Sequence, residues 1–121
     1  MVKALFDTNI LTDYLNAFPE ARRELQRYTE KAVSIVTWME VMVGTRDDLE
    51  AATRSFLKSF EVIIVDALIA ERAVNLRRSH RIKLPDAIVW ATAHSRSMIF
   101  VTRDARDFQA EDPGVRMPYN V

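Results

Sequence analysis

Short runs of apolar residues alternate along the chain with longer segments of helical periodicity. The apolar runs hold at most one polar residue and lack the strict alternation of a strand with one solvated face: Ala4–Phe6, Ala32–Val36, Val62–Val65 and Met98–Val101. Strands of a parallel sheet have this pattern because helices cover both of their faces. We therefore expect four buried strands.

The segments between these runs carry the start signals of helices. Pro19–Glu20, Asp47–Asp48 and Pro85–Asp86 each place a proline or acidic residues where a helix is expected to begin. A further helix is indicated within Ile69–Leu76, where apolar residues recur three or four positions apart.

Two of these helical patterns continue over several turns. Apolar residues at helical spacing extend from Ala21 to Ala32 in the first and from Leu49 to Phe60 in the second. Strands that alternate with helices are typical of layered α/β domains with a mainly parallel sheet. The pattern predicts a three-layer α/β/α sandwich with a central sheet of four to five strands.

Composition narrows the class of protein. At 121 residues, 49% of them hydrophobic, the chain is expected to form one domain over residues 1–121. The absence of cysteine excludes disulfides, thiolate zinc sites and a cysteine nucleophile. The longest apolar run, Ala87–Ala93, is too short to cross a bilayer and no targeting signal is evident, so we expect a cytoplasmic protein.

Four acidic residues fall where predicted strands end or helices begin: Asp7, Glu40, Asp86 and Asp104. In a parallel sheet the carboxyl ends of the strands meet at one edge, so all four would lie together. Such a cluster requires a counter-ion, because like charges raise one another's pKa. Oxygen ligands favour Mg²⁺ or Mn²⁺, whereas two histidines and no cysteine argue against zinc.

Each acid also has a structural interpretation. Asp7 could cap a helix, and Asp86 could be stabilised by the dipole of the helix whose first turn it occupies. Asp104 could belong to a turn, and Glu40 could face solvent. Glu40 is the most informative, because it is the only charged residue within Trp38–Val43. A carboxylate site for a divalent ion would suit phosphodiester hydrolysis by a metal-activated water.

Four motifs occur in order along the chain: Asp7-Thr8-Asn9, Ser34-x-x-Thr37-x-x-Glu40, Leu84-Pro85-Asp86-Ala87 and Thr102-Arg103-Asp104-x-x-Asp107-Phe108. Together they resemble PIN-domain ribonucleases, and especially the VapC toxins of toxin–antitoxin pairs. The resemblance extends from Leu5 to Phe108.

The resemblance implies a single PIN-like nuclease domain with the three-layer fold and an endoribonuclease activity that depends on Mg²⁺ or Mn²⁺. It implies that Asp7 and Asp86 are the main metal ligands and that Glu40 and Asp104 complete the catalytic site. It further implies a homodimer and a small antitoxin protein as partner. The polar residues that would orient the acids are Thr8, Asn9, Thr37 and Thr102, with Asp107 as an alternative to Asp104 or a loop anchor.

The charge balance, 17 basic against 17 acidic residues, argues against a simple basic nucleic-acid binder. Setting the four proposed ligands aside leaves a net basic protein around an acidic site. The basic run Arg77–Lys83 leads directly to Asp86 and could contact RNA phosphates. The candidate RNA contacts are Arg78, Arg81, Lys83, Arg103 and Arg106, whereas His80 and His94 are expected to be packed or solvated.

Two alternatives differ in class. A phospho-receiver domain would use Asp66, after Val62–Val65, as its acceptor. Against it, the first strand is followed by one acid rather than an acidic pair, and Thr102-Arg103 stands where that class requires lysine. A catalytically silent PIN-like module that only binds RNA or protein is the other alternative.

Overall fold

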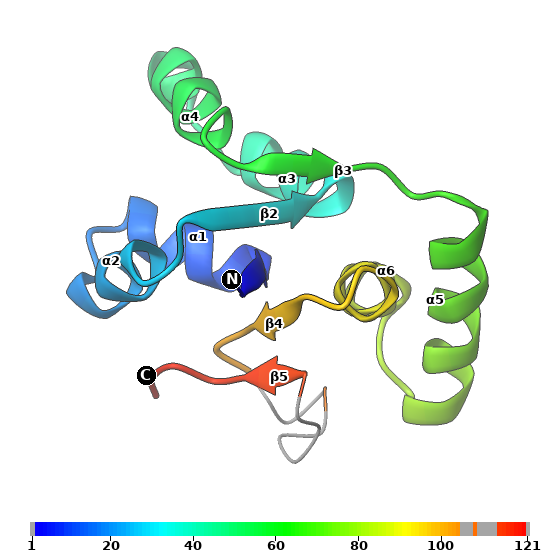
Figure 1. The fold of residues 1–121 in the computed structure, drawn as a ribbon. Helices are drawn as coiled ribbons and strands as arrows, with labels where there is room; N and C mark the ends of the chain where they lie inside the picture. The colour runs from blue at the N-terminus through cyan, green and yellow to red at the C-terminus, as the bar shows by residue number, and fades with distance from the viewer. Residues whose placement is uncertain (1, 105–107, 109–113, 121) are drawn as a thin grey trace.

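The computed structural model describes residues 2–104, 108 and 114–120. Its described residues form a five-stranded sheet in which every neighbouring pair is parallel, in the order β3-β2-β1-β4-β5 (Figure 1). The strands are β1 (Lys3–Phe6), β2 (Glu30–Ser34), β3 (Glu61–Ile63), β4 (Ile99–Val101) and β5 (Val115–Arg116). The predicted α/β class with a parallel sheet is confirmed.

Helices cover both faces of this sheet. They are α1 (Thr8–Leu15), α2 (Pro19–Gln26), α3 (Ile35–Val43), α4 (Glu50–Leu57), α5 (Ala67–His80) and α6 (Leu84–Ser95), with a 3-10 turn at Asp47–Leu49. The core on one face joins the sheet to α5 and α6, which lie side by side, and the core on the other joins it to α1–α4 (Figure 1). This confirms the three layers.

Alternate residues of the central strand β1 pack into the two cores. Leu5 packs with α5 and α6, whereas Ala4 and Phe6 pack with the helices on the other face, and all three are fully buried. Burying each large apolar side chain contributes roughly 1.5–3 kcal/mol. Two-sided burial explains the continuous apolar run of this strand, whereas the expectation that the run Val62–Val65 is buried is wrong, because of its four residues only Ile63 is buried.

The second strand ends earlier than predicted. The expectation of strand through Val36 is wrong, because α3 begins at Ile35 and the buried Ser34 caps it, its Oγ accepting from Val36 N at 3.1 Å. β3 likewise ends at Ile63, and Ile64 lies 67% exposed beyond it. A serine hydroxyl at a helix start competes effectively with strand propensity.

Two of the predicted helices extend beyond the ends of the observed helices. Helix α2 ends at Gln26, so Ala32 belongs to β2 rather than to a helix, and Phe60 lies beyond the end of α4. Strand β5, only two residues long, has no apolar run to mark it. No helix in the described part of the chain is both long and apolar enough to cross a membrane.

Replacing Ser34 by alanine tests the helix boundary. Because the hydroxyl caps α3, Ser34→Ala should lower the free energy of unfolding by about 1 kcal/mol in urea titrations. The control Ser79→Ala, at an exposed position inside α5, should change it by no more than about 0.5 kcal/mol. Equal effects of the two substitutions would contradict the capping role.

Candidate active site

The strand order brings the chain segments that carry three predicted site residues to one edge of the sheet. Asp7 follows β1, and the segment Thr102–Asp104, called here the post-β4 segment, follows the neighbouring strand β4. The two are joined by a backbone hydrogen bond in which Asp7 N donates to Val101 O at 2.9 Å. Parallel neighbours end at the same edge, which is where α/β proteins bind ligands.

Asp7 is held by three donors from its surroundings. It is 6% exposed, and its Oδ1 accepts from Thr8 N at 2.8 Å, which caps α1. Its Oδ2 accepts from Thr102 Oγ1 at 2.9 Å and from Asn9 Nδ2 at 3.4 Å. These hydrogen bonds fix the orientation of the carboxylate at the end of the central strand.

Thr8 connects this carboxylate to α3. Its Oγ1 donates to Glu40 Oε1 at 2.6 Å and lies 3.2 Å from Thr37 Oγ1, which is fully buried. Thr37 and Glu40 are one turn apart on α3 and therefore share a face. The exposed Glu40 is thus directed toward the start of α1.

The post-β4 segment is bound to the same helix start. Asp104 N donates to Thr102 Oγ1 at 3.2 Å, and Arg103 N donates to Asn9 Oδ1 at 3.1 Å. Asp104 is therefore two hydrogen bonds away from Asp7, through the hydroxyl of Thr102.

Burial raises the pKa of Asp7 to about 6, from an ordinary value of 3.8. The hydrogen bonds from Thr102 and Thr8 N oppose this shift, and the negative charges of Asp86 and Glu40 add to it. Asp86, half-buried in the first turn of α6, is therefore near enough to act on Asp7. The structure thus brings Asp7, Glu40 and Asp86 into one electrostatic cluster.

The donor set can be compared with what a metal requires. Among residues 2–104, 108 and 114–120, no three His, Cys, Asp or Glu side chains are close enough to enclose an ion. Asp7 and Glu40 nevertheless offer carboxylate oxygens, and no Lys or Arg of the described part pairs with either of them. Oxygen donors with excess negative charge fit a hard divalent cation.

Other predicted residues lie elsewhere. Asp107 and Arg106 are outside the described residues. His80 packs its ring edge against Trp90, with centroids 4.9 Å apart, and His94 Nδ1 lies 2.5 Å from Arg72 Nη1. Both histidines therefore contact side chains of α5 and α6.

Asp66 has a structural role. Its Oδ1 accepts from Ile69 N at 2.9 Å, which caps α5, and its Oδ2 lies 3.8 Å from Arg96 Nη2. A capping carboxylate at an edge strand does not match the central acceptor that a phospho-receiver requires.

Sequence reasoning missed Asp13, which is 4% exposed. Its Oδ2 lies 3.0 Å from Arg103 Nε and accepts from Tyr119 Oη at 2.8 Å. The available signal was its spacing, because Asp13 follows Asn9 by four residues and so shares a face of α1 with it.

Known proteins share this fold. The PIN domain family matches residues 4–111. A chain of a toxin–antitoxin complex from Klebsiella pneumoniae is 45% identical, with a TM-score of 0.92 over 98% of this chain and 99% of that one. A chain of DNA-bound VapBC from Salmonella typhimurium is 25% identical, with a TM-score of 0.78 over 96% of each chain.

FitAcB from Neisseria gonorrhoeae, at 22% identity, shares the fold, with a TM-score of 0.82 over 98% of this chain and 99% of that one. None of the curated proteins matches the sequence. The chain belongs to the PIN domain family, and the resemblance indicated by its motifs is confirmed.

The raised pKa of Asp7 predicts how stability varies with pH. Folded Asp7 keeps its proton up to about pH 6, whereas the unfolded carboxyl loses it near 3.8, so Asp7 lowers stability increasingly as pH rises through this window. Asp7→Asn should therefore be more stable than wild type by about 2 kcal/mol at pH 7.5, and by much less at pH 4.

Urea titrations from pH 4 to 8 measure this difference. The control Asp47→Asn makes the same chemical change at an exposed position in the 3-10 turn, outside the site. A difference between wild type and Asp7→Asn that stays constant across the range would contradict the prediction.

Proposed function

We propose that this protein is a metal-dependent endoribonuclease and the toxin of a toxin–antitoxin module. The observation that carries the proposal is the buried, hydrogen-bonded carboxylate of Asp7, whose pKa the negative charges of Asp86 and Glu40 raise further. Such a cluster is unfavourable unless a cation balances it. Membership of the PIN family supports the nuclease class.

Asp7 and Asp86 would hold Mg²⁺ or Mn²⁺, with Glu40 and Asp104 completing the site. The bound ion would supply Lewis-acid stabilisation of the phosphate and a lowered pKa for an attacking water. Thr102, Asn9 and the backbone of Thr8 hold the Asp7 carboxylate in one orientation. Thr8 does the same for Glu40, so the acids are preorganised before substrate binds.

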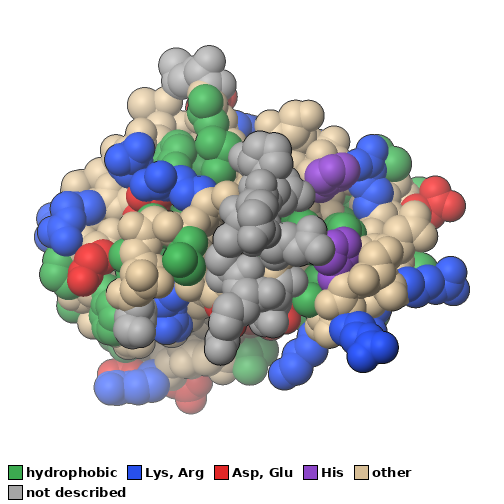
Figure 2. Space-filling model, turned by 90° about the horizontal axis from the view of Figure 1, so that it is seen from below, with side chains coloured by type: hydrophobic (Ala, Val, Ile, Leu, Met, Phe, Trp, Pro, Cys, Tyr) green, Lys and Arg blue, Asp and Glu red, His purple; other side chains and the backbone are tan. Residues whose placement is uncertain are grey.

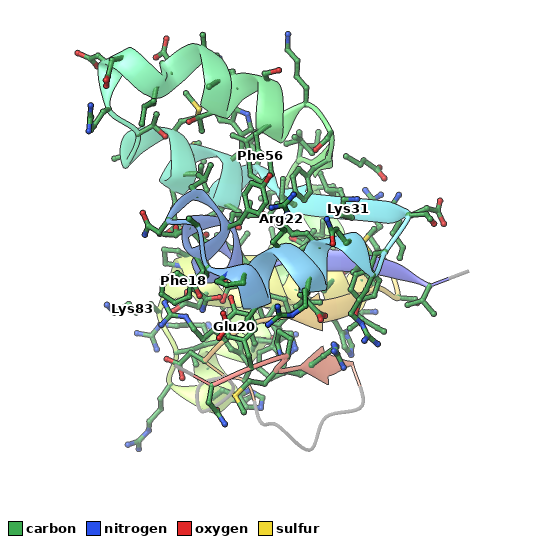
Figure 3. The ribbon with its side chains drawn as sticks, turned by 90° about the vertical axis from the view of Figure 1, so that its left-hand side faces the viewer. Phe18, Glu20, Arg22, Lys31, Phe56 and Lys83 are labelled. Carbon is green, nitrogen blue, oxygen red and sulfur yellow. The ribbon has the colours of Figure 1, made fainter. Side chains whose placement is uncertain are left out.

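Basic residues near the end of α5 would bind the RNA backbone. Arg78, Arg81 and Lys83 are exposed in the stretch that leads into α6, which carries Asp86. Lys and Arg side chains lie around much of the margin of the face seen in Figure 2, and Lys83 lies at the periphery of the view in Figure 3. Phosphate contacts of this kind position a strand without reading its sequence.

Protein partners would cover an apolar surface. Met39 and Val43 on α3 are 47% and 87% exposed, and Ile64 after β3 and Leu68 in the first turn of α5 are exposed as well. Exposed apolar clusters of this kind mark interaction sites. The 45%-identical neighbour comes from a toxin–antitoxin complex, which supports an antitoxin as one partner; a second copy of this chain would be the other.

Cleavage assays test the proposal directly. Wild type should cut single-stranded RNA with Mg²⁺ or Mn²⁺ and stop when EDTA is added. Asp7→Asn and Asp86→Asn should each lose at least about 100-fold in rate, because each removes a proposed ligand. Induced expression in bacteria should arrest growth for wild type and not for either variant.

The control is Asp66→Asn, which keeps a helix-capping side chain and should leave cleavage within about twofold of wild type. Undiminished cleavage in both site variants, or none with any divalent metal, would overturn the nuclease assignment. Phosphorylation of Asp66 by a small phosphodonor would favour the phospho-receiver instead.

Salt dependence tests the RNA-binding residues. The double substitution Arg78→Gln and Arg81→Gln should weaken binding of a single-stranded RNA by catalytically inactive Asp7→Asn protein. The slope of log affinity against log salt should fall by about 0.7 per lost phosphate contact. Lys58→Gln, close to the amino end of β3 and so to the opposite edge of the sheet, is the control. An unchanged slope in the double variant would exclude these two residues.

A further inference from the structure

We propose that Asp13 is a positioning residue for the nuclease site: through Arg103 it holds the post-β4 segment, and with it Asp104, against the helix that begins at Asp7. This inference rests on the proposed function. It gives Arg103 a role inside the protein rather than on RNA.

One face of α1 holds Arg103 at two points. Asn9 and Asp13 are one helical turn apart, so their side chains lie on the same side of the helix. Asn9 Oδ1 accepts from the main-chain N of Arg103 at 3.1 Å, and Asp13 Oδ2 lies 3.0 Å from its side-chain Nε. Backbone and guanidinium of a single residue are therefore both bound to α1.

The neighbours of Arg103 are residues of the site. Thr102 Oγ1 donates its hydrogen to Asp7 Oδ2, and Thr102 Oγ1 in turn accepts from Asp104 N. Fixing Arg103 thus sets both the donor that orients Asp7 and the position of Asp104. Because Asp7 caps the start of α1 and Asp13 lies within it, the same helix positions Asp7 and, through Arg103, Asp104.

The burial of Asp13 explains why this anchor is strong. Its side chain is only 6% exposed, and that of Arg103 is 35% exposed. The contact is an ion pair rather than a well-angled hydrogen bond, since Arg103 Nε meets no hydrogen-bond acceptor within the described residues. A buried carboxylate is tolerated only when charge and hydrogen bonds compensate it.

A hydrogen bond from Tyr119 is the second interaction that compensates the burial of the Asp13 carboxylate. Tyr119 Oη donates to Asp13 Oδ2 at 2.8 Å, so the C-terminal segment after β5 closes over the same carboxylate. Burial and this hydrogen bond raise the pKa of Tyr119, which keeps the phenol a donor. Helix α1, the post-β4 segment and the C-terminal segment therefore meet at Asp13.

Glu24 offers a matched comparison. It is 3% exposed and accepts from Arg116 Nε at 2.7 Å and from Arg116 Nη2 at 3.0 Å, joining α2 to β5. Within the described residues, the contact between Arg116 and the post-β4 segment is made by the main-chain oxygen of Arg116, which accepts from Thr102 N in the sheet. Glu24 is thus an equally buried acid with the same kind of partner, but without a side-chain link to Asp104.

The test compares Asp13→Asn with Glu24→Gln in the full chain, below the melting temperature of both. Asp13→Asn should lower kcat for single-stranded RNA by about 10- to 100-fold, with KM within about twofold. It should also raise about 10-fold the Mg²⁺ concentration that gives the half-maximal increase in Tm. Glu24→Gln should lower Tm but leave kcat and the Mg²⁺ dependence within about twofold of wild type.

A second pair of variants keeps the test valid if Asp13→Asn does not fold. Arg103→Lys keeps both charges but has a shorter reach, and should shift the Mg²⁺ dependence of Tm by about threefold or more while retaining part of the activity. Tyr119→Phe, which preserves the ion pair, should have the smaller effect. No shift in Arg103→Lys would overturn the proposal.

The outcomes separate this inference from the proposed function. Wild type that neither cleaves RNA nor gains stability from Mg²⁺ would refute both. Active wild type with an Asp13→Asn variant that behaves like Glu24→Gln would refute the positioning role alone. A rise in KM in Arg103→Lys with kcat unchanged, and with Asp13→Asn unaffected, would make Arg103 an RNA contact and overturn the proposal.

Discussion

The carboxylate of Asp7 is held almost entirely out of solvent at the end of the central strand, and much of the site is arranged around that burial. Three donors face it, from the backbone of Thr8 and the side chains of Asn9 and Thr102. They stabilise the ionised form only in part, because burial still raises its pKa to about 6. In the proposed function, a divalent cation would relieve this residual instability.

Parallel pairing makes this arrangement possible. With β4 next to β1, Thr102 lies beside Asp7 although the two are 95 residues apart in sequence. Helices α5 and α6 on one face and α1–α4 on the other bury both sides of the strands, which leaves the edge at their carboxyl ends for polar groups. The same edge receives α3 directly from β2, because Ser34 ends the strand and caps the helix in one residue.

Local patterns in the sequence were enough to predict the three layers of the fold and to single out the candidate acids of the site. The apolar runs at Ala4–Phe6 and Met98–Val101 correspond to central strands, since two-sided burial leaves a continuous hydrophobic signal. These patterns were not enough to locate the ends of the helices and strands, or to predict strand β5. Ala32 satisfied a helical spacing and a strand run at once, and only the pairing of Ala32 with Leu5 and Glu61 decides between them.

By itself the sequence determined the family and the parallel α/β class, and it supplied the candidate site residues as a prediction, because each inference depends on residue types at short spacing. The tertiary structure alone decided which strands are neighbours and which charges meet. The pairing of Asp13 with Arg103 and of Glu24 with Arg116 spans about three-quarters of the chain, and no local pattern marks it. A buried carboxylate needs a cationic partner, and that partner can lie anywhere in the sequence because the fold decides which residues are close. Hydrophobic periodicity indicates which residues are buried, but it does not identify the partner.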